Sequence, residues 1–378
     1  MVNSRMDTLI PEPATRAAQP TAPVPRKKPL VRRVSPDSSQ QTRHAVQLAF
    51  LALNVWIGVL FFLWVRHFET QGVSRFVERP AGVDGWLPIE GLMGLRYFLL
   101  TRQVPAVHPS AMVLLSVFLV ASLLIKKSFC SWLCPIGTLS EYLWKLGRRV
   151  FRRSLVLPRR LDMPVRSLKY LLLAFFLFIV FSMATQELGD FIASPFGIVA
   201  DVKMLNFFRH LGTMGIGVIF TLVVLSVMIQ NVWCRFLCPY GALMGIVSAL
   251  SPVKIRRDAQ ACIDCGKCSK ACPSHLPVGR LVQIRSVECT GCMECIAVCP
   301  AQNALQLSLP PRGASAPASK AAAARWRNRV PEPRMIAVIL AVVFFAAVGT
   351  ARITGHWQTN IPHEVYMQLV PEPDLHSH

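Results

Sequence analysis

Long apolar stretches alternate with basic segments along the chain. A membrane-spanning helix needs about 20 mainly apolar residues, within a range of about 17–25. By this measure the sequence predicts about five membrane-spanning helices, at residues 45–65, 107–125, 168–184, 211–230 and 335–351. The pattern therefore predicts a mainly α-helical, polytopic membrane protein.

Lysine and arginine are distributed unevenly between the flanking segments. The first set of segments holds 8, 10 and 14 of them (residues 1–44, 126–167 and 231–334), and the alternate set holds 5, 2 and 1 (residues 66–110, 185–210 and 352–378). Positive residues are retained on the cytoplasmic side of a membrane. We therefore expect a multi-pass protein of the bacterial cytoplasmic (inner) membrane, with a cytoplasmic N-terminus and a periplasmic C-terminus. If the last apolar run were a buried soluble helix, the C-terminal tail would be cytoplasmic instead.

The composition fits a membrane protein. Charged residues make up 16% of the chain, against about 25% in soluble domains. A net charge of +21 suits nucleic acid or anionic lipid, and membrane lipid is the expected partner, with no nucleic acid, because the basic residues lie beside apolar runs. Residues 1–44 predict a disordered basic cytoplasmic tail, residues 310–334 a linker, and residues 352–378 a periplasmic tail.

Residues 262–300 contain the most specific motif of the chain. The pattern Cys-x2-Cys-x2-Cys-x3-Cys-Pro occurs twice, and thiolates with this spacing hold the iron–sulfur clusters of bacterial ferredoxins. In two-cluster ferredoxins the fourth cysteine of each run binds the other cluster. The sequence therefore predicts two [4Fe–4S] clusters in an α+β ferredoxin-like domain at residues 251–309, with the ligand sets Cys262, Cys265, Cys268, Cys299 and Cys289, Cys292, Cys295, Cys272.

Zinc is the alternative occupant of these cysteines. Paired cysteines also bind zinc, which takes four ligands in structural sites. Two identical quartets, each followed by proline, suit zinc poorly. Disulfides are also not expected, because all twelve cysteines fall in predicted cytoplasmic segments, where thiols stay reduced.

The other four cysteines form two shorter pairs within the predicted four-span domain at residues 45–250. The stretches CSWLCPIG and CRFLCPYG form an internal repeat, each following an apolar run, and contain Cys130, Cys134, Cys234 and Cys238. A spacing of four places both sulfurs on one side of a helix, and the following proline suits the first turn of a new helix. The four thiols could therefore meet at the membrane edge, as a further metal centre or as redox-active dithiols. Buried cysteines at a helix contact are the alternative.

These motifs together resemble a known family. CSWLCP, CRFLCP and the trailing CIDCGKCSKACP and CTGCMECIAVCP are similar to the membrane-bound polyferredoxins of the NapH/NosR/CcoG type, over about residues 45–300. The resemblance implies transfer of single electrons between the quinone pool or a cytoplasmic donor and a membrane or periplasmic acceptor, with a respiratory redox protein as partner. It favours an electron-transfer subunit over a stand-alone oxidoreductase.

The chain also departs from each branch of that family. The NosR type has a flavin-binding domain and the CcoG type has a folded domain after its last helix, and this sequence has no segment long enough for either, so no flavin is expected. The NapH type usually has four spans, one fewer than predicted here. A metal (copper) or thiol reductase, and a redox-sensing or assembly factor for a respiratory enzyme, remain as alternative functions.

Histidines lie mostly on the predicted outer side. Seven of the nine, all except His44 and His275, fall there, and we expect interfacial or tail side chains rather than metal ligands. In the outer loop before the second apolar run, Glu90 and Arg96 could line a quinone head-group site, but solvated side chains are the simpler expectation.

Overall fold

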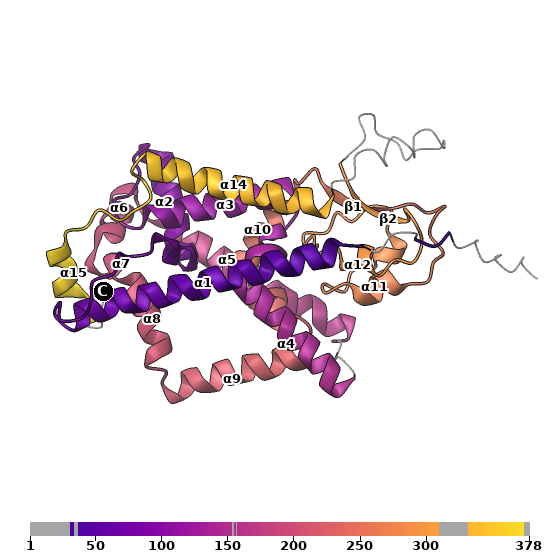
Figure 1. The fold of residues 1–378 in the computed structure, drawn as a ribbon, viewed down its shortest axis with the longest axis horizontal. Coiled ribbons are helices and arrows are strands. Elements are labelled where there is room, and N and C mark those ends of the chain that lie inside the picture. Colours follow the sequence, from indigo (N-terminus) through magenta and orange to yellow (C-terminus); the bar gives the residue numbers. More distant parts are fainter. Residues whose placement is uncertain (1–30, 34–36, 153–154, 156, 310–331, 374–378) are drawn as a thin grey trace, which may run out of the picture.

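The computed structural model describes residues 31–33, 37–152, 155, 157–309 and 332–373. The remaining residues are drawn as a grey trace in Figure 1. Most of the predicted tail at residues 1–44 and of the predicted linker at residues 310–334 lies outside the described residues. His376 and His378 also lie outside them.

Three helices are long and apolar enough to cross a membrane: α1 (Ser39–Glu69), α5 (Arg159–Ser182) and α14 (Pro333–Ile353). The helices α1 and α14 run along the long axis of the molecule (Figure 1), and Phe50 and Phe344 pack edge to face between them, with ring centroids 5.4 Å apart. The helix α1 starts at Ser39, so residues 39–44 are helical rather than part of a tail. The carboxylate of Asp37 accepts a hydrogen bond from the Ser39 backbone at 2.7 Å and so satisfies a free amide at the helix start.

Two predicted spans are shorter helices. The helices α3 (Pro109–Leu124) and α9 (Thr213–Met228) have 16 residues each, or about 24 Å against a hydrocarbon core of about 30 Å. Left-handed residues at His108 and Lys126 limit α3 at its two ends. The helix α9 follows α8 (Ala200–Arg209) at a bend of 83°, so the described residues contain three spanning helices by length, or four if the bent pair counts as one.

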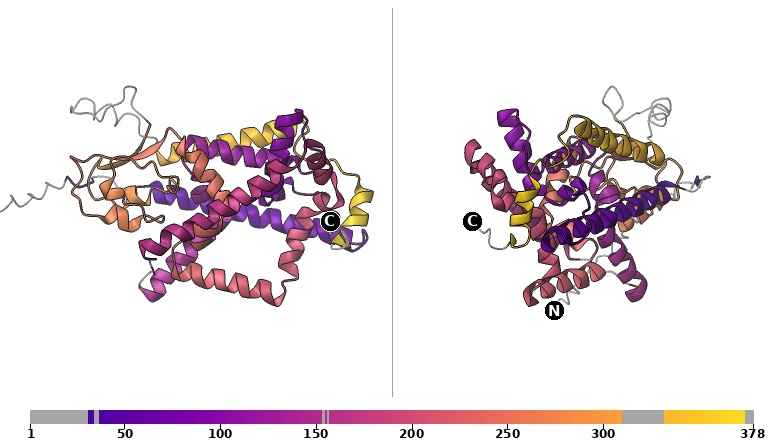
Figure 2. Two further views of the ribbon diagram at one scale, coloured as in Figure 1. Left: turned by 180° about the vertical axis from the view of Figure 1, so that it is seen from behind. Right: turned by 60° about the vertical axis from the view of Figure 1, so that its left-hand side comes forward.

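Short helices gather at one end of the molecule (Figures 1 and 2). They are η1 (Ala81–Trp86), α2 (Pro88–Thr101), α6 (Thr185–Ala193), α7 (Pro195–Ile198) and α15 (His363–Leu369). They enclose a second hydrophobic core around Val65, Phe68, Leu188 and Val199, all nearly inaccessible to solvent. This core joins the end of α1 to the end of α5 and to the short helices.

The cysteine-rich module occupies the opposite end (Figure 1). It is bracketed by β1 (Lys254–Arg257) and β2 (Leu305–Ser308), which pair antiparallel with Ile255 opposite Leu307. Between the strands lie α11 (Lys267–Ala271), η4 (Val278–Arg280) and α12 (Glu294–Ala297). Both Cys-x2-Cys-x2-Cys runs are therefore held between one pair of strands.

The first turns of α1 fasten this module to the membrane helices. The buried guanidinium of Arg43 donates two hydrogen bonds to Glu141, at 2.6 and 2.7 Å, and one to Glu294 at 3.1 Å. Glu141 lies on α4 (Pro135–Phe151) and Glu294 between two cysteines of the module. Nearby, Gln40 donates to the carbonyl oxygen of Cys292 at 2.9 Å. Arg43 thus joins three segments that are far apart in the sequence.

We expect Arg43→Gln to loosen the contact between the module and the membrane helices. It removes two hydrogen bonds from Glu141 and one from Glu294, whereas Glu141 keeps Lys145 at 2.6 Å. A hydrogen bond to a charged group contributes about 1.5–3 kcal/mol. Thermal unfolding of anaerobically purified protein should show a lower Tm and faster proteolysis of the module, compared with Arg149→Gln on the exposed face of α4. Equal Tm values for the two variants would show that Arg43 does not hold the module.

Candidate metal centres

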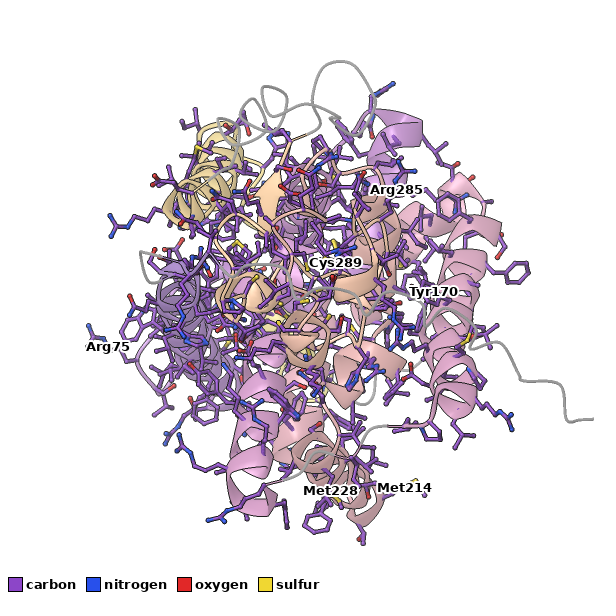
Figure 3. All side chains as sticks on the ribbon, turned by 90° about the vertical axis from the view of Figure 1, so that its right-hand side faces the viewer. Arg75, Tyr170, Met214, Met228, Arg285 and Cys289 are labelled. Carbon is purple, nitrogen blue, oxygen red and sulfur yellow. The ribbon has the colours of Figure 1, made fainter. Side chains whose placement is uncertain are left out.

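Four cysteines of the module converge on one cavity, and we call them the inner quartet. Cys272, Cys289, Cys292 and Cys295 are all buried and line this cavity with apolar residues of the module, among them Ile255, Leu276 and Ile284. Cys295 interacts electrostatically with each of the other three. Figure 3 looks at the molecule from the module end, and Cys289 lies near the middle of this view.

The other four cysteines of the module form a surface quartet. Cys299 interacts electrostatically with Cys268, Cys265 and Cys262. Cys265 is exposed, Cys262 and Cys299 are half-buried, and only Cys268 is buried. The structure thus brings the fourth cysteine of each run beside the other run, and the cluster that each cysteine binds stays a prediction.

Matching backbone turns direct the thiols of each run. The residues before and after the second cysteine have positive φ angles in both runs: Asp264 (55°) and Gly266 (71°) in the first, and Gly291 (66°) and Met293 (58°) in the second. These left-handed residues curl each loop, so that its three closely spaced cysteines face a common point.

Sulfur spacing separates a cluster from a single metal ion. Four thiolates at about 2.3 Å from one zinc ion lie about 3.8 Å from one another. Among the described residues, no three cysteine sulfurs all lie within 4.8 Å of one another. Each quartet is therefore too widely spaced for one zinc ion and has room for a larger group.

A buried lysine supports an anionic occupant of the inner quartet. The ammonium nitrogen of Lys126 is buried, has no hydrogen-bond partner among the described residues, and interacts electrostatically with Cys289. An isolated buried charge is costly unless an opposite charge lies beside it. Iron held by four thiolates would supply that negative charge, so the inner quartet fits a [4Fe–4S] cluster.

The two Cys-x3-Cys-Pro pairs adopt one backbone conformation. Each runs through a single π turn, η2 (Phe129–Leu133) or η3 (Trp233–Leu237), and then caps a new helix, α4 or α10 (Pro239–Ala249). The amides of Cys134 and Cys238 each bond five residues back, both at 2.9 Å. The expected first-turn prolines are confirmed. The expectation of both cysteines on one helix face is wrong, because the second cysteine lies beyond the π turn.

The second sulfur of each pair lies at a helix N-terminus. Cys238 Sγ accepts a hydrogen bond from the Gly241 amide at 3.2 Å. Cys134 makes no such hydrogen bond, although the amides of Gly137 and Ile136 lie close enough to lower its pKa against the larger effect of burial. A Cβ at Gly137 would lie 2.2 Å from the Cys130 carbonyl oxygen, so only glycine fits there. Nearby amides and the helix dipole partly offset the cost of burying a thiolate at both positions.

The structure brings these four thiols together, and we call them the membrane-edge cysteines. Cys234 interacts electrostatically with Cys238, Cys134 and Cys130. Burial raises the pKa of Cys130 to about 12 and that of Cys134 to about 11. Both thiols therefore stay protonated near neutral pH unless a metal displaces the protons.

A second cavity lies between the membrane-edge cysteines and the inner quartet. Cys130 and Cys234 line it from one side and Cys292 from the other. Charged side chains also border it, including Lys127, Arg43 and Glu288. Glu288 is held by Lys169 and Tyr170 of α5, each at 2.6 Å. No sequence pattern singles out these charged residues, because lysines and arginines beside apolar runs usually face water or lipid head groups.

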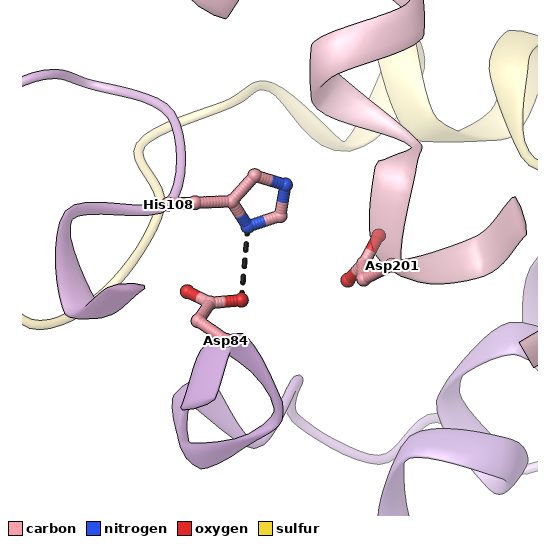
Figure 4. Close-up of side chains that lie close together, drawn as sticks. All are labelled: Asp84, His108 and Asp201. Atoms are coloured by element: carbon pink, nitrogen blue, oxygen red, sulfur yellow. Dashed lines mark hydrogen bonds and ion pairs between the residues drawn. The ribbon is translucent and has the colours of Figure 1, made fainter. Parts of the chain in front are cut away.

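The opposite end of the molecule contains a buried ionic network. His108 Nδ1 lies 2.9 Å from Asp84 (Figure 4). Arg79 bonds both Asp84 (2.5 Å) and Asp201 (2.6 Å). Among the histidine, cysteine, aspartate and glutamate residues that the structure describes, one group of three has its ligand atoms all within 4.8 Å of one another: Asp84, His108 and Asp201. The guanidinium of Arg79 already bridges its two carboxylates, so we interpret the group as a structural ion-pair network.

This network corrects two expectations from the sequence. His108 is 1% exposed rather than interfacial, and both carboxylate oxygens of Glu90 are buried rather than solvated, with no hydrogen-bond partner among the described residues. Glu90 lies 3.7 Å from His108. Arg96 instead donates to the backbone carbonyls of Val180 and Met183. The surrounding short helices remove these side chains from water.

Comparison with protein families divides the chain in the same way. A family model described as a 4Fe-4S binding domain matches residues 107–154 and, again, residues 211–258. A model described as a 4Fe-4S dicluster domain matches residues 254–300. Each copy of the first domain contains one Cys-x3-Cys-Pro pair, and the dicluster domain contains both quartets. No solved structure matches the chain.

The apolar helices and these domains define a membrane-bound iron–sulfur electron-transport protein. The chain belongs to the NapH/NosR-type family of membrane polyferredoxins. It is 49% identical over 336 residues to YccM of Escherichia coli K12, a candidate electron transport protein, covering 89% of this chain and 91% of YccM. The protein NirI of Paracoccus denitrificans is 30% identical, over 49% of this chain and 27% of NirI. The ferredoxin-type protein NapH of E. coli is 27% identical, over 46% of this chain and 59% of NapH.

Exchange of the fourth cysteines between the two runs can be tested directly. We expect Cys299→Ser to remove the signal of the solvent-exposed cluster and Cys272→Ser to remove that of the buried one. Electron paramagnetic resonance (EPR) of the reduced proteins, with a relaxing agent in solution to broaden the exposed cluster, distinguishes the two. The reverse pattern would mean that each run binds its own cluster.

We also expect the ion-pair network to be structural. Asp84→Asn leaves Arg79 and His108 without their shared carboxylate, and loss of one partner of a buried pair costs about 3–5 kcal/mol. The Tm should fall while iron content stays unchanged, whereas Asp190→Asn, on the exposed face of α6, should leave both unchanged. Loss of iron in Asp84→Asn alone would link this network to the metal centres.

Proposed function

We propose that this protein carries single electrons at the cytoplasmic edge of the bacterial inner membrane. The electrons would pass between the quinone pool or a cytoplasmic donor and a membrane or periplasmic acceptor. The observation that carries the proposal is the shared cavity bordered by Cys130, Cys234 and Cys292, because it makes the membrane-edge cysteines neighbours of the inner quartet.

Three groups of four cysteines would hold the redox centres. The surface quartet and the inner quartet would each hold a [4Fe–4S] cluster. The membrane-edge cysteines, two from each copy of the repeated 4Fe-4S domain, would hold a third metal centre. When bound, iron–sulfur clusters supply one-electron chemistry that no amino-acid side chain provides.

The protein environment differs between the three groups of cysteines, and this difference suggests the order in which electrons would pass through them. The surface quartet includes the exposed Cys265, which a soluble redox protein can approach. The inner quartet is buried behind it. The membrane-edge cysteines lie at the ends of α3 and α9, beside the helices that would face lipid. Under this proposal, the surface quartet, the inner quartet and the membrane-edge cysteines would follow one another from the solvent to the membrane.

The proposed orientation follows from charge. The basic segments and all three cysteine groups would lie on the cytoplasmic side, and the buried ion-pair network and α15 on the periplasmic side. The bent α8–α9 pair and the short α3 would complete a five-span arrangement. Their limited length would be accommodated by local thinning of the bilayer.

A Cys134→Ser, Cys238→Ser double variant tests the proposed function. We expect dithionite still to reduce the centres of both module quartets. Reoxidation of that reduced protein by duroquinone in liposomes should slow at least about tenfold, a barrier increase of about 1.4 kcal/mol. Leu146→Ser, exposed on α4, serves as the control and should react like the unmodified protein.

Two outcomes would count against the proposal. An unchanged reoxidation rate would remove the membrane-edge cysteines from the electron path. An unchanged reoxidation rate, combined with loss of the ability to reduce copper ions or disulfides in the double variant, would favour the reductase alternative.

A further inference from the structure

Two consecutive lysines at the end of α3 are buried beside the cysteine groups. Lys126 is 0% exposed and Lys127 is 3% exposed. Lysines at a membrane edge normally extend their ammonium groups into water. These two side chains instead point into the protein, although they follow an apolar helix directly.

The helix α10 provides a slot for Lys127. Gly241 and Gly245 lie one helical turn apart, and a Cβ on either would lie 3.5 or 3.8 Å from the ammonium nitrogen of Lys127. The Gly241 position is also 3.6 Å from Cys238 Sγ. The absence of side chains at both glycines therefore leaves room for a charged group next to the membrane-edge cysteines.

Lys127 interacts with cysteines of two groups. It favours the charged forms of Cys130, Cys234 and Cys238 at the membrane edge, and also that of Cys289 in the inner quartet. It also acts on Glu288, whose carboxylate is held by Lys169 and Tyr170. Its ammonium group thus lies within electrostatic range of both sites.

Lys126 is directed toward the inner quartet alone. Its backbone has a φ of 55°, which turns the side chain away from its neighbour. Its Cβ lies 3.4 Å from the Cβ position of Gly291, between Cys289 and Cys292. The other charged group that acts on it is Lys254, which repels it. The cysteines are therefore its source of negative charge.

Three other cations of this region are already paired. Arg43 is bound by Glu141 and Glu294, Lys169 by Glu288, and Arg235 by Asp162. Each of these pairs largely cancels its own charge. Near the surface quartet, Lys270 is exposed, so water and salt screen its charge.

We propose that Lys126 and Lys127 are built-in counter-charges that raise the reduction potentials of two centres. Lys126 acts on the centre of the inner quartet, and Lys127 acts mainly on that of the membrane-edge cysteines; the second part rests on the proposed function. A cluster held by thiolates becomes more negative when it gains an electron, so a buried cation favours its reduced form. Electrons are thereby drawn inward from the surface quartet.

The test is an anaerobic redox titration followed by EPR. Lys126→Met should lower the potential of the inner centre only. Lys127→Met should lower that of the membrane-edge centre most, and that of the inner centre less. Lys126→Arg and Lys127→Arg keep the charge and should retain potentials close to those of the unmodified protein. Lys270→Met, exposed on α11, is the matched control and should shift no potential.

The outcomes that overturn the inference are distinct from those that overturn the proposed function. Potentials that stay within the Lys270→Met range, or that fall equally in the Met and Arg variants, exclude a counter-charge role. If the Met variants lose iron and the Arg variants keep it, the positive charge is required to hold the cluster, which supports the counter-charge role. Loss of iron in both the Met and the Arg variants excludes that role. If the unmodified protein lacks a membrane-edge centre, the proposed function fails, and Lys126→Met still tests the inner centre.

Discussion

Negative charge on buried cysteines must be balanced, and this constraint organises the cysteine-rich half of the molecule. Eight cysteines lie where the module meets the membrane helices: the inner quartet belongs to the module, and the membrane-edge cysteines belong to the turns that follow α3 and α9. Taking charged thiolates out of water is unfavourable unless cations or a metal lie next to them. The buried lysines, the amide donor at α10 and the Arg43 ion pairs all help to meet this requirement.

The same constraint explains why the module is firmly attached. A free two-cluster domain could solvate its cysteines on all sides, but here α1 and the η2 turn cover the inner quartet. Trp132 and Ser131 of η2 both donate hydrogen bonds to carbonyl groups within the second cysteine run. The internal repeat contributes the same π turn twice, so that two distant segments supply equivalent thiols to one place.

Much of the cysteine-rich site could be predicted from the sequence, because cysteine spacing encodes local geometry. The Cys-Pro steps also marked the starts of α4 and α10 correctly. The buried charges could not be predicted, because Lys126, Lys127 and Arg43 look like ordinary basic residues at a membrane edge. His108 and Glu90 were misjudged for a related reason: their burial depends on how short helices from separate parts of the chain pack together, which no local pattern reveals. Span lengths were overestimated where α3 and α9 end at backbone breaks that hydropathy does not register.

The central claim is that three groups of four cysteines hold three metal centres. Iron and acid-labile sulfide analysis of the anaerobically purified full-length protein, combined with native mass spectrometry, tests it most directly. The account predicts about twelve iron and about twelve sulfide per chain if the third centre is also a [4Fe–4S] cluster. About eight of each would contradict the third centre, and stoichiometric zinc without iron would contradict the account as a whole.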